Sequence, residues 1–381
     1  MSRIGRIGSL LLVSTGLASA ATAVTPLQTT VTTNAAAATS GLLTATATGR
    51  GATRTVTGAV GVGEITAARF DTRAGILVGA RVNVNTAVAA IAQVTGTVDN
   101  GNGSSRSVTA TTGLTGTIAT PGVSIAGTTL SASRQCTGSS CATSQQTTTT
   151  GSIVATSAVP LANLTAYAGA GTVAFTRTAS GSTTATNGSR ATSGTANGLF
   201  SFGSANQASN VYSITYDYVN FANPSFAGAT TTIETTLDFG TLIQNRASKT
   251  LNFSLFNIGN INSAGLSLTS ITRQTNDANF TSSLTTFTNG LDAGTGRDYS
   301  AIFAPTTQGM ANEMFTMVFG DFAVGGVGAR FYQLQLRAKA NVIAEPMGVP
   351  EPATWAMMIL GFGLVGATMR SRAHRGRTTT C

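Results

Sequence analysis

The sequence predicts an all-β fold: two β-sandwich domains, an N-terminal signal-peptide helix and one short C-terminal transmembrane helix. The 381 residues include 42% hydrophobic residues, enough for a core, but only 9% charged residues and a single Trp. Thr, Ala, Gly, Ser and Val dominate, which favours strands and tight turns over long helices. Apolar and polar residues alternate with period two in many stretches. The length favours two domains.

Charge is concentrated at the two ends of the chain. The net charge of +9 would ordinarily suggest a nucleic-acid partner. Six of the 22 basic residues and one of the 13 acidic residues lie in the end segments, which leaves a net charge of +4 between them. These end residues are Arg3, Arg6, Glu351, Arg370, Arg372, Arg375 and Arg377. We therefore expect no nucleic-acid partner.

Residues 1–23 have the pattern of a signal peptide. MSRIGRIG is basic, SLLLVSTGLASA is apolar, and small residues at alternate positions place cleavage after Ala20 or Ala23. The alternative is a short buried core helix. The pattern at the extreme N-terminus favours export and cleavage by signal peptidase.

Cysteine usage fits an exported protein. Cys136 and Cys141 lie in the polar stretch RQCTGSSCAT, where a local disulfide would close a small ring. The C-x4-C spacing differs from a thioredoxin-type pair, and no His or further Cys lies nearby to complete a zinc site. Cys381, the last residue, falls in the tail.

Residues 24–63 are rich in Thr, Ala and Gly and poor in aromatic residues. They are expected to form a low-complexity lead-in that is loosely structured, or else weak edge strands. The Gly61 to Gly63 and Gly169 to Gly171 pairs are expected to lie in turns, since no helix pattern follows them to bind a phosphate.

Residues 64–219 are predicted to form the first β domain. One strand face carries Val82, Val84, Thr86 and Val88. In NVYSITYDYV the face with the Tyr side chains is the better core candidate, and it consists of Tyr212, Ile214, Tyr216 and Tyr218.

Residues 220–234 mix Pro, Gly, Ala and Thr without alternation, so a linker is expected there. The second β domain is predicted over residues 235–343, with a further linker over 344–349. Its strands are expected at TTLDFGTL, TLNFSLFNIG, LSLTSITR, YSAIFAP, MFTMVFGDFA and FYQLQLRAKANVI. In the last strand, Tyr332 to Val342 should alternate into the core.

Residues 350–377 form a distinct tail. Residues 353–369 carry no charge, and as a helix they would be about 25 Å long, which just spans a bilayer. Trp355 lies at one end as an interfacial anchor. At the other end Arg370, Arg372, Arg375 and Arg377 form a basic anchor that is expected to stay in the cytoplasm.

The tail PEPATWAMMILGFGLVGATMRSRAHR resembles the PEP-CTERM sorting signal in its PEPxxWAMMIxGFGxxG variant. The resemblance implies export in a Gram-negative bacterium, a transient inner-membrane tether, and processing by exosortase near the Pro-Glu-Pro. The mature form would then reach the cell surface or the extracellular space. By this resemblance the recognition and helix residues are Pro350, Glu351, Pro352, Trp355, Ala356, Met357, Met358, Gly361, Phe362 and Gly363. A plain membrane anchor without processing is the alternative.

The body of the chain shows two further resemblances. Residues 64–219, with ARFDTRAGILVGARVNV and VYSITYDY, look like a choice-of-anchor E domain. Residues 235–343, with LDFGTL, LNFSLFNIGN and YSAIFAPTTQGM, look like an immunoglobulin-like choice-of-anchor D module. The stretch MFTMVFGDFAVGGVGARFY departs from that module in its Met and Gly content. Neither family brings catalytic residues.

The sequence predicts no enzymatic activity and no cofactor. The only His, His374, lies in the tail, so the mature chain would have no Ser-His-Asp triad and no His-bound metal. A glycosidase with two carboxylates is the formal alternative. The stretch from Asp99 to Gly103 carries oxygen ligands for calcium, but its Asn-Gly pair after a Val-rich strand favours a hairpin turn. The stretch from Asn276 to Asn279 is expected to be a turn as well.

Three hypotheses follow for function. The leading one is a non-enzymatic protein of the cell surface or extracellular matrix, associated with exopolysaccharide or biofilm. The alternatives are an adhesin-like module that binds a glycan or protein, and a fibre subunit that assembles through Thr-rich edge strands. The many Ser and Thr residues are interpreted as solvent-facing strand positions, with O-glycosylation as the alternative.

Overall fold

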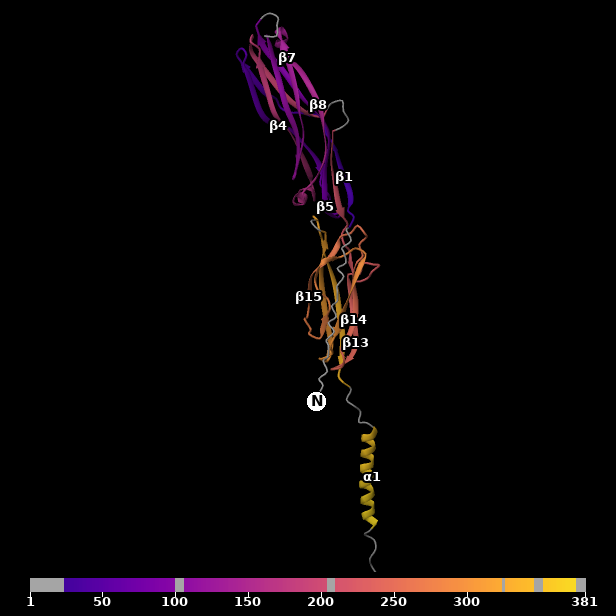
Figure 1. Ribbon diagram of the computed structural model, residues 1–381. Coiled ribbons are helices and arrows are strands. Elements are labelled where there is room, and N and C mark those ends of the chain that lie inside the picture. The colour runs from indigo at the N-terminus through magenta and orange to yellow at the C-terminus, as the bar shows by residue number, and fades with distance from the viewer. Residues whose placement is uncertain (1–23, 100–105, 204–209, 324–325, 346–351, 375–381) are drawn as a thin grey trace, which may run out of the picture.

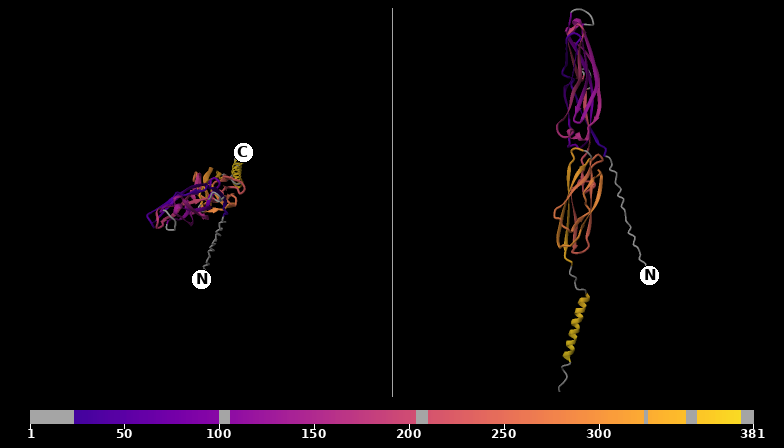
Figure 2. Two further views of the ribbon diagram at one scale, coloured as in Figure 1. Left: turned by 90° about the horizontal axis from the view of Figure 1, so that it is seen from above. Right: turned by 60° about the vertical axis from the view of Figure 1, so that its left-hand side comes forward.

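The computed structural model describes residues 24–99, 106–203, 210–323, 326–345 and 352–374. Two β units follow one another end to end, and the helix α1 (Pro352–His374) extends beyond the second unit (Figures 1 and 2). The other helical segments in these residues are two short 3-10 helices, η1 (Gly138–Ala142) and η2 (Leu161–Tyr167). The predicted all-β fold with a short C-terminal helix is confirmed.

The unit farther from α1, here called the distal unit, contains strands β1 to β11 in two antiparallel sheets. One sheet has the order β1-β11-β5-β10-β2, with β3 paired to β10 and β8 paired to β5, and the other has the order β4-β9-β6-β7. The strands are β1 (Leu27–Asn34), β2 (Ala38–Thr39), β3 (Leu43–Thr48), β4 (Thr53–Ala68), β5 (Ile76–Val98), β6 (Ser107–Thr120), β7 (Val123–Thr137), β8 (Gln145–Ala158), β9 (Thr172–Asn187), β10 (Ala191–Phe202) and β11 (Asn210–Val219).

The period-two pattern of β5 and β11 builds the distal core. Val82, Val84, Thr86 and Val88 of β5, which were predicted to share one strand face, are all buried. On β11 the predicted face is also buried, since Tyr212, Ile214 and Tyr216 have no exposed surface and Tyr218 packs against the same cluster. Tyr212 meets Phe175 of the opposite sheet edge to face, with ring centroids 5.5 Å apart.

Toward the end farthest from α1 the core consists of small side chains. Alanines of β3, β6, β9 and β10 pack there with Val94, Val108 and the two cysteines. Gly198 of β10 is required for this close approach, because a Cβ atom on it would lie 2.1 Å from the Thr183 Oγ1 of the facing sheet. Thr183 and Thr112 satisfy each other by a buried hydroxyl hydrogen bond of 3.1 Å.

Residues 24–63 form edge strands rather than a loose lead-in. β1 pairs with β11 over eight residues, β2 and β3 pair with β10, and β4 pairs with β9 along its whole length. Threonine suits such positions because β-branched side chains pack well on a pleated surface. Thr55 and Thr184, for example, join β4 to β9 by a hydroxyl hydrogen bond of 2.9 Å.

Two expected turns are corrected by the strand pairing. The stretch after Val98 does not close a hairpin, because β5 and β6 belong to different sheets and the chain crosses between them there. Asn100 to Gly103 themselves lie outside the described residues. Gly61 to Gly63 lie within β4, at a register shift opposite β9 where Gly63 has φ of 98°. This is a β-bulge, and it requires glycine.

The unit next to α1, here called the proximal unit, contains strands β12 to β20. One sheet has the order β12-β14-β18-β16, and the other has the order β13-β20-β19-β15-β17, in which β13 runs parallel to β20. The strands are β12 (Pro224–Ser225), β13 (Glu234–Ile243), β14 (Lys249–Asn257), β15 (Gly265–Arg273), β16 (Phe280–Ser282), β17 (Phe287–Leu291), β18 (Thr295–Phe303), β19 (Gly309–Phe322) and β20 (Phe331–Ile343).

Aromatic side chains fill the proximal core. Phe239, Phe280 and Phe303 are fully buried, and the rings of Phe280 and Phe303 lie 4.6 Å apart. On β20 the predicted alternation is confirmed: Leu334 and every second residue to Val342 are buried, and Tyr332 packs at the edge of the core.

Residues 220–234 are packed rather than forming a free linker. Asn220 forms an isolated parallel β-bridge with Ser263, and Ala222 is buried in the proximal core. Ser225 is fully buried, and its hydroxyl donates to the Thr230 carbonyl and accepts from two backbone N–H groups. Pro, Gly and Ser in this stretch therefore serve a compact turn structure that composition alone does not distinguish from a linker.

The junction between the units is built from interlocked residues. Ile76, the first residue of β5, is buried in the proximal core, whereas the next residue, Leu77, belongs to the distal core. Leu77 and Val327 exchange two backbone hydrogen bonds of 3.0 and 2.9 Å. Within the proximal unit, the Asp321 carboxylate accepts from the Ala222 N–H at 2.9 Å and fixes the chain where it enters that unit. The two cores thus share one continuous strand.

Candidate functional site

The tail forms the helix α1, which lies apart from both β units (Figure 1). Pro352 is its first residue, a position where the missing N–H and fixed φ of proline are favourable. Ala, Met and Leu in the following turns have high helix propensity. Within the helix no charged residue occurs before Arg370. The helix is longer than the predicted 353–369 and includes Arg370 and Arg372.

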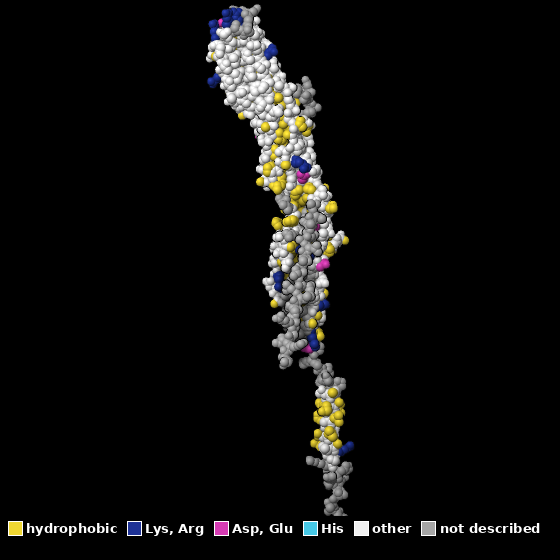
Figure 3. Space-filling view, viewed as in Figure 1, with side chains coloured by type: hydrophobic (Ala, Val, Ile, Leu, Met, Phe, Trp, Pro, Cys, Tyr) yellow, Lys and Arg dark blue, Asp and Glu magenta, His cyan; other side chains and the backbone are white. Residues whose placement is uncertain are grey.

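Every residue of α1 from Ala353 to Ser371 is exposed. Figure 3 shows apolar side chains along the helix and a basic side chain near its end. Ala353–Ser371 is long and apolar enough to span a membrane, with a mean hydropathy of 1.2 and none of it buried against the protein. Because this apolar helix is not buried against the rest of the described chain, a lipid bilayer is the environment that suits its side chains.

The structure places the expected sorting residues as follows. Trp355, Ala356, Gly361, Phe362 and Gly363 lie on α1, and a Cβ atom at either glycine would meet nothing within 4 Å. Pro352 begins the helix, and Arg370 and Arg372 lie in its last two turns. Pro350, Glu351, Arg375 and Arg377 lie outside the described residues, as do Ala20 and Ala23 of the signal peptide.

Cys136 and Cys141 form a disulfide, with Cα atoms 5.0 Å apart. Cys136 ends the core-facing series of β7 and Cys141 lies in η1, and both are buried in the small-residue core of the distal unit. The bond closes the turn that connects β7 to β8 at the end of the molecule farthest from α1.

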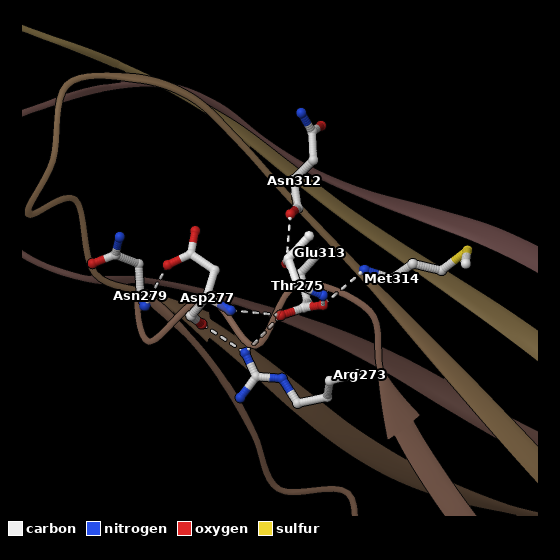
Figure 4. Close-up of polar contacts among 7 residues, drawn as sticks. All are labelled: Arg273, Thr275, Asp277, Asn279, Asn312, Glu313 and Met314. Carbon is white, nitrogen blue, oxygen red and sulfur yellow. Dashed lines mark hydrogen bonds and ion pairs between the residues drawn. The ribbon is translucent and has the colours of Figure 1, made fainter.

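A buried carboxylate in the proximal unit is a polar centre that the sequence did not indicate. The Glu313 side chain on β19 has no exposed surface and accepts four hydrogen bonds (Figure 4). Oε1 accepts from the N–H groups of Thr275 at 2.9 Å and Met314 at 3.2 Å, and Oε2 accepts from the Asp277 N–H and the Arg273 guanidinium, each at 2.9 Å.

These hydrogen bonds determine the ionisation of Glu313. Burial raises the pKa of its carboxyl, but the hydrogen bonds from Thr275, Arg273 and Asp277 together outweigh burial, so the pKa is lowered below its ordinary value. Glu313 is therefore a charged anchor for the turn after β15. Within that turn Asn276 has φ of 53°, and the Asp277 carboxylate accepts from the Asn279 N–H at 2.9 Å. This is a turn, as expected from the sequence.

The described polar groups do not assemble a metal centre. Across residues 24–374, leaving out the undescribed gaps, no group of three or more His, Cys, Asp or Glu side chains lies close enough to hold a metal ion. Asp99, the first residue of the expected calcium stretch, instead forms an ion pair with Arg50 at 2.6 Å.

Comparisons with known structures show partial similarities. About 34% of this chain aligns with 37% of the Vibrio cholerae VesB protease, at 14% identity and a TM-score of 0.22. About 29% aligns with 82% of the ASH/PapD-like domain of human CEP192, at 13% identity and a TM-score of 0.22. The comparison with curated proteins finds no match.

The family comparison concerns the tail. Residues 348–373 match the PEP-CTERM protein-sorting motif, which coincides with the approach to α1 and nearly all of the helix. The motif indicates a substrate of exosortase. Together with the exposed apolar helix, it identifies an exported, membrane-tethered precursor destined for the cell surface.

Proposed function

We propose that the protein is a non-enzymatic component of the cell surface or extracellular matrix, which exosortase releases from its membrane tether near Pro350 to Pro352. The mature protein would associate with exopolysaccharide or biofilm matrix. The observation that carries the proposal is the PEP-CTERM motif on a helix that contacts neither β unit. The tail serves delivery, so the β units carry whatever the mature protein does.

The contents of the β units support a non-enzymatic role. The only His lies on α1 and would leave with the tail. The buried carboxylate, Glu313, is occupied by backbone N–H groups and Arg273, so it has no free oxygen position to act on a substrate. The resemblance of the two units to choice-of-anchor E and D modules fits the same role.

Fractionation of the native host tests the sorting step. The C-terminal peptide of the protein would be recovered from inner-membrane, outer-membrane and culture fractions and measured by mass spectrometry. We expect a C-terminus between residues 349 and 353 in the outer or culture fraction. An intact tail through Arg377 found in the inner membrane alone would contradict processing. A matching preparation from a strain without exosortase serves as the control.

The matrix role needs a separate measurement. We expect the processed protein to sediment with extracted exopolysaccharide and to be released when the polysaccharide is digested. Release into the culture as a freely diffusing protein, with digestion having no effect, would contradict matrix association and would leave the sorting step intact.

Fibre assembly is a second candidate, favoured by the edge strand β1. Its sequence LQTTVTTN contains no charge and no proline, the usual protections of an edge, and it pairs with β11 on one side. Analytical ultracentrifugation at increasing concentration would show oligomers if β1 pairs between molecules. A constant monomer mass would exclude this route. Thr32→Lys, which places a charge at an exposed position of β1, should abolish any oligomers that form through this edge.

A further inference from the structure

The end of the distal unit farthest from α1 is basic. Figure 3 shows Lys and Arg side chains gathered there above a long surface with few charges. Four segments of the described chain reach this end: residues 43–59, 89–99 together with 106–115, 129–150 and 183–198. Their charged residues are five arginines and one aspartate: Arg50, Arg54, Arg106, Arg134, Arg190 and Asp99. We call these six residues the arginine tip, and its net charge is +4.

Two backbone hydrogen bonds and one ion pair hold three of the arginines in adjacent turns. The Asp99 N–H donates to the Arg190 carbonyl at 3.1 Å, and the Asp99 carboxylate pairs with Arg50 at 2.6 Å. The Arg106 carbonyl accepts from the Gly138 N–H, beside the disulfide-closed turn. Turns from both sheets therefore present their arginines together at one end of the molecule, although the arginines are up to 140 residues apart in sequence.

Three of the five arginine side chains are exposed to a ligand, whereas Arg106 and Arg134 are partly buried. Arg50, Arg54 and Arg190 are exposed, and the Arg50 side chain retains 62% of its accessible surface although it pairs with Asp99. One carboxylate cannot neutralise five guanidinium groups. An exposed cluster of this kind attracts anions, and each guanidinium can bind a carboxylate through two parallel hydrogen bonds.

An open groove of about 770 Å³ adjoins the arginine tip at Asp99, the one residue of the tip that lines it. Asp99 and Gly138, whose backbones contact Arg190 and Arg106, form part of its wall. The rest of the lining is mainly small and hydroxylated, and consists of Thr95, Gly96, Thr97, Val98, Ser139, Cys141, Ala142, Ser193 and Thr195. Hydroxyl groups both donate and accept, which suits the hydroxyls of sugar rings.

The residue types of the tip favour a polysaccharide over a nucleic acid. The four segments contain no Phe, Tyr or Trp, so no aromatic ring is present on which unpaired bases would stack. A chain of sugar rings with regularly spaced carboxylates can place its charges on the arginines and its hydroxyls in the groove.

We propose that the arginine tip binds a carboxylated polysaccharide, with uronate carboxylates on Arg50, Arg54 and Arg190 and a sugar ring in the adjoining groove. The inference rests on the proposed matrix role and adds to it the binding surface and the ligand class. The tip lies at the opposite end of the molecule from α1, so it meets the surrounding matrix first while the precursor is tethered.

The test uses the full chain purified in detergent and immobilised polygalacturonate as the probe. The tip variant combines Arg50→Gln, Arg54→Gln and Arg190→Gln. The control variant removes the same three charges elsewhere, with Arg73→Gln, Arg246→Gln and Arg337→Gln, all exposed residues outside the tip. Circular dichroism and thermal melting verify that both variants fold. Neutral dextran and duplex DNA are the comparison ligands.

We expect the tip variant to bind polygalacturonate about tenfold or more weakly, and the control variant to stay within about twofold of the wild type. Binding of the wild type should weaken as salt rises, and dextran should bind more weakly than polygalacturonate. An Asp99→Asn variant, which removes the only acidic group of the tip, should bind polygalacturonate at least as tightly as the wild type.

Three results would overturn the proposal. Equal losses in the tip and control variants would mean that net charge, not the tip, governs binding. Tighter binding of duplex DNA than of polygalacturonate would assign the tip to nucleic acid. Full retention of polygalacturonate binding by the tip variant would place the polysaccharide site elsewhere and leave the matrix role standing. The matrix role itself would fail if the wild-type protein did not associate with the matrix in cells.

Discussion

At the scale of single residues, substitution of Glu313 is expected to destabilise the proximal unit. Its carboxylate is buried and accepts hydrogen bonds from three backbone N–H groups and from the Arg273 guanidinium. Glu313→Gln removes the charge and points an amide N–H₂ at donors that need an acceptor. We expect the free energy of unfolding of the proximal unit to fall by about 2–4 kcal/mol, measured by urea denaturation.

Glu234→Gln is the matched control, because Glu234 is exposed and lies 3.9 Å from Arg337. An exposed pair of this kind contributes about 0–1 kcal/mol. Equal effects of the two substitutions would show that Glu313 does not anchor the turn.

The pH dependence of stability gives a second prediction for Glu313. Its folded-state pKa lies below the ordinary value of 4.5, so the unfolded chain binds more protons in this range. The contribution of Glu313 is therefore complete above pH 4.5 and is lost as the pH falls through the lowered pKa. The stability difference between wild type and Glu313→Gln should shrink on acidification, as measured by urea denaturation over a pH series. A difference that stays constant to pH 3 would contradict this assignment.

Residue patterns predicted the core but not the buried charge. Tyr212 and Tyr216, or Leu334 and Leu336, follow from alternation because a strand presents every second side chain to one face. Glu313 occupies an inward position of β19 and would be expected outside by charge alone. Its partners are backbone groups of a turn 36 and 38 residues earlier, a pairing that no local pattern encodes.

At the scale of elements, the disulfide of the turn between β7 and β8 compensates for a small core. Alanines around Cys136 and Cys141 bury little apolar surface. A cross-link between residues five apart lowers the entropy of the unfolded chain by an amount equivalent to about 2 kcal/mol. The double variant Cys136→Ala and Cys141→Ala should lose about that much stability by chemical denaturation. Reduction of the wild type should produce the same loss, and unchanged stability on reduction would contradict the prediction.

The helix α1 is only just long and apolar enough to span a membrane, so a single added charge should prevent its insertion. Phe362 lies near the middle of the apolar segment and is exposed. Phe362→Lys places a charge there, which costs about 2.5–3.5 kcal/mol of insertion free energy. We expect the precursor to shift from the membrane to the soluble periplasmic fraction, while Phe362→Leu stays in the membrane. Membrane retention of the Lys variant would mean that a second contact holds the precursor.

Elements were predictable where a single segment determines them. The helix of the tail and most strands of the proximal unit follow from hydropathy and alternation. The change of sheet between β5 and β6 was not predictable in this way, because β6 pairs with β7 and β9 rather than with β5. An Asn-Gly pair predicts a turn, but the sheet to which the chain returns depends on residues far away in sequence. The packing of residues 220–234 depends on Ser263 and Asp321 in the same way.

At the scale of the whole molecule, β5 connects the junction to the arginine tip. It runs from Ile76 in the proximal core to Val98 beside Asp99, and 23 strand residues extend about 75 Å. Figure 2 shows the two units end to end, and we expect the packing of Ile76 in the proximal core to hold the distal unit in line with the proximal unit. The tip is thereby held away from the end of the molecule that carries α1.

Substitution of Ile76 tests this alignment of the two units. The side chain has no exposed surface, belongs to the proximal core and lies against Gly326, so it joins the first residue of β5 to the other unit. Ile76→Ala leaves a cavity at the junction that costs about 2–5 kcal/mol of packing. The hydrogen-bonded pair of Leu77 and Val327 remains, but it can act as a hinge once the packing beside it is lost.

We expect small-angle X-ray scattering of Ile76→Ala to show a shorter mean maximum dimension and a wider distribution of shapes than the wild type. Ile214→Ala is the matched control, because Ile214 is equally buried but lies within the distal core, where the same cavity destabilises one unit without bending the molecule. Bending in both variants would point to general loosening. Bending in neither would mean that the strand pairing of Leu77 with Val327 is sufficient to keep the units aligned, and that the tip is positioned by backbone hydrogen bonds rather than by packing.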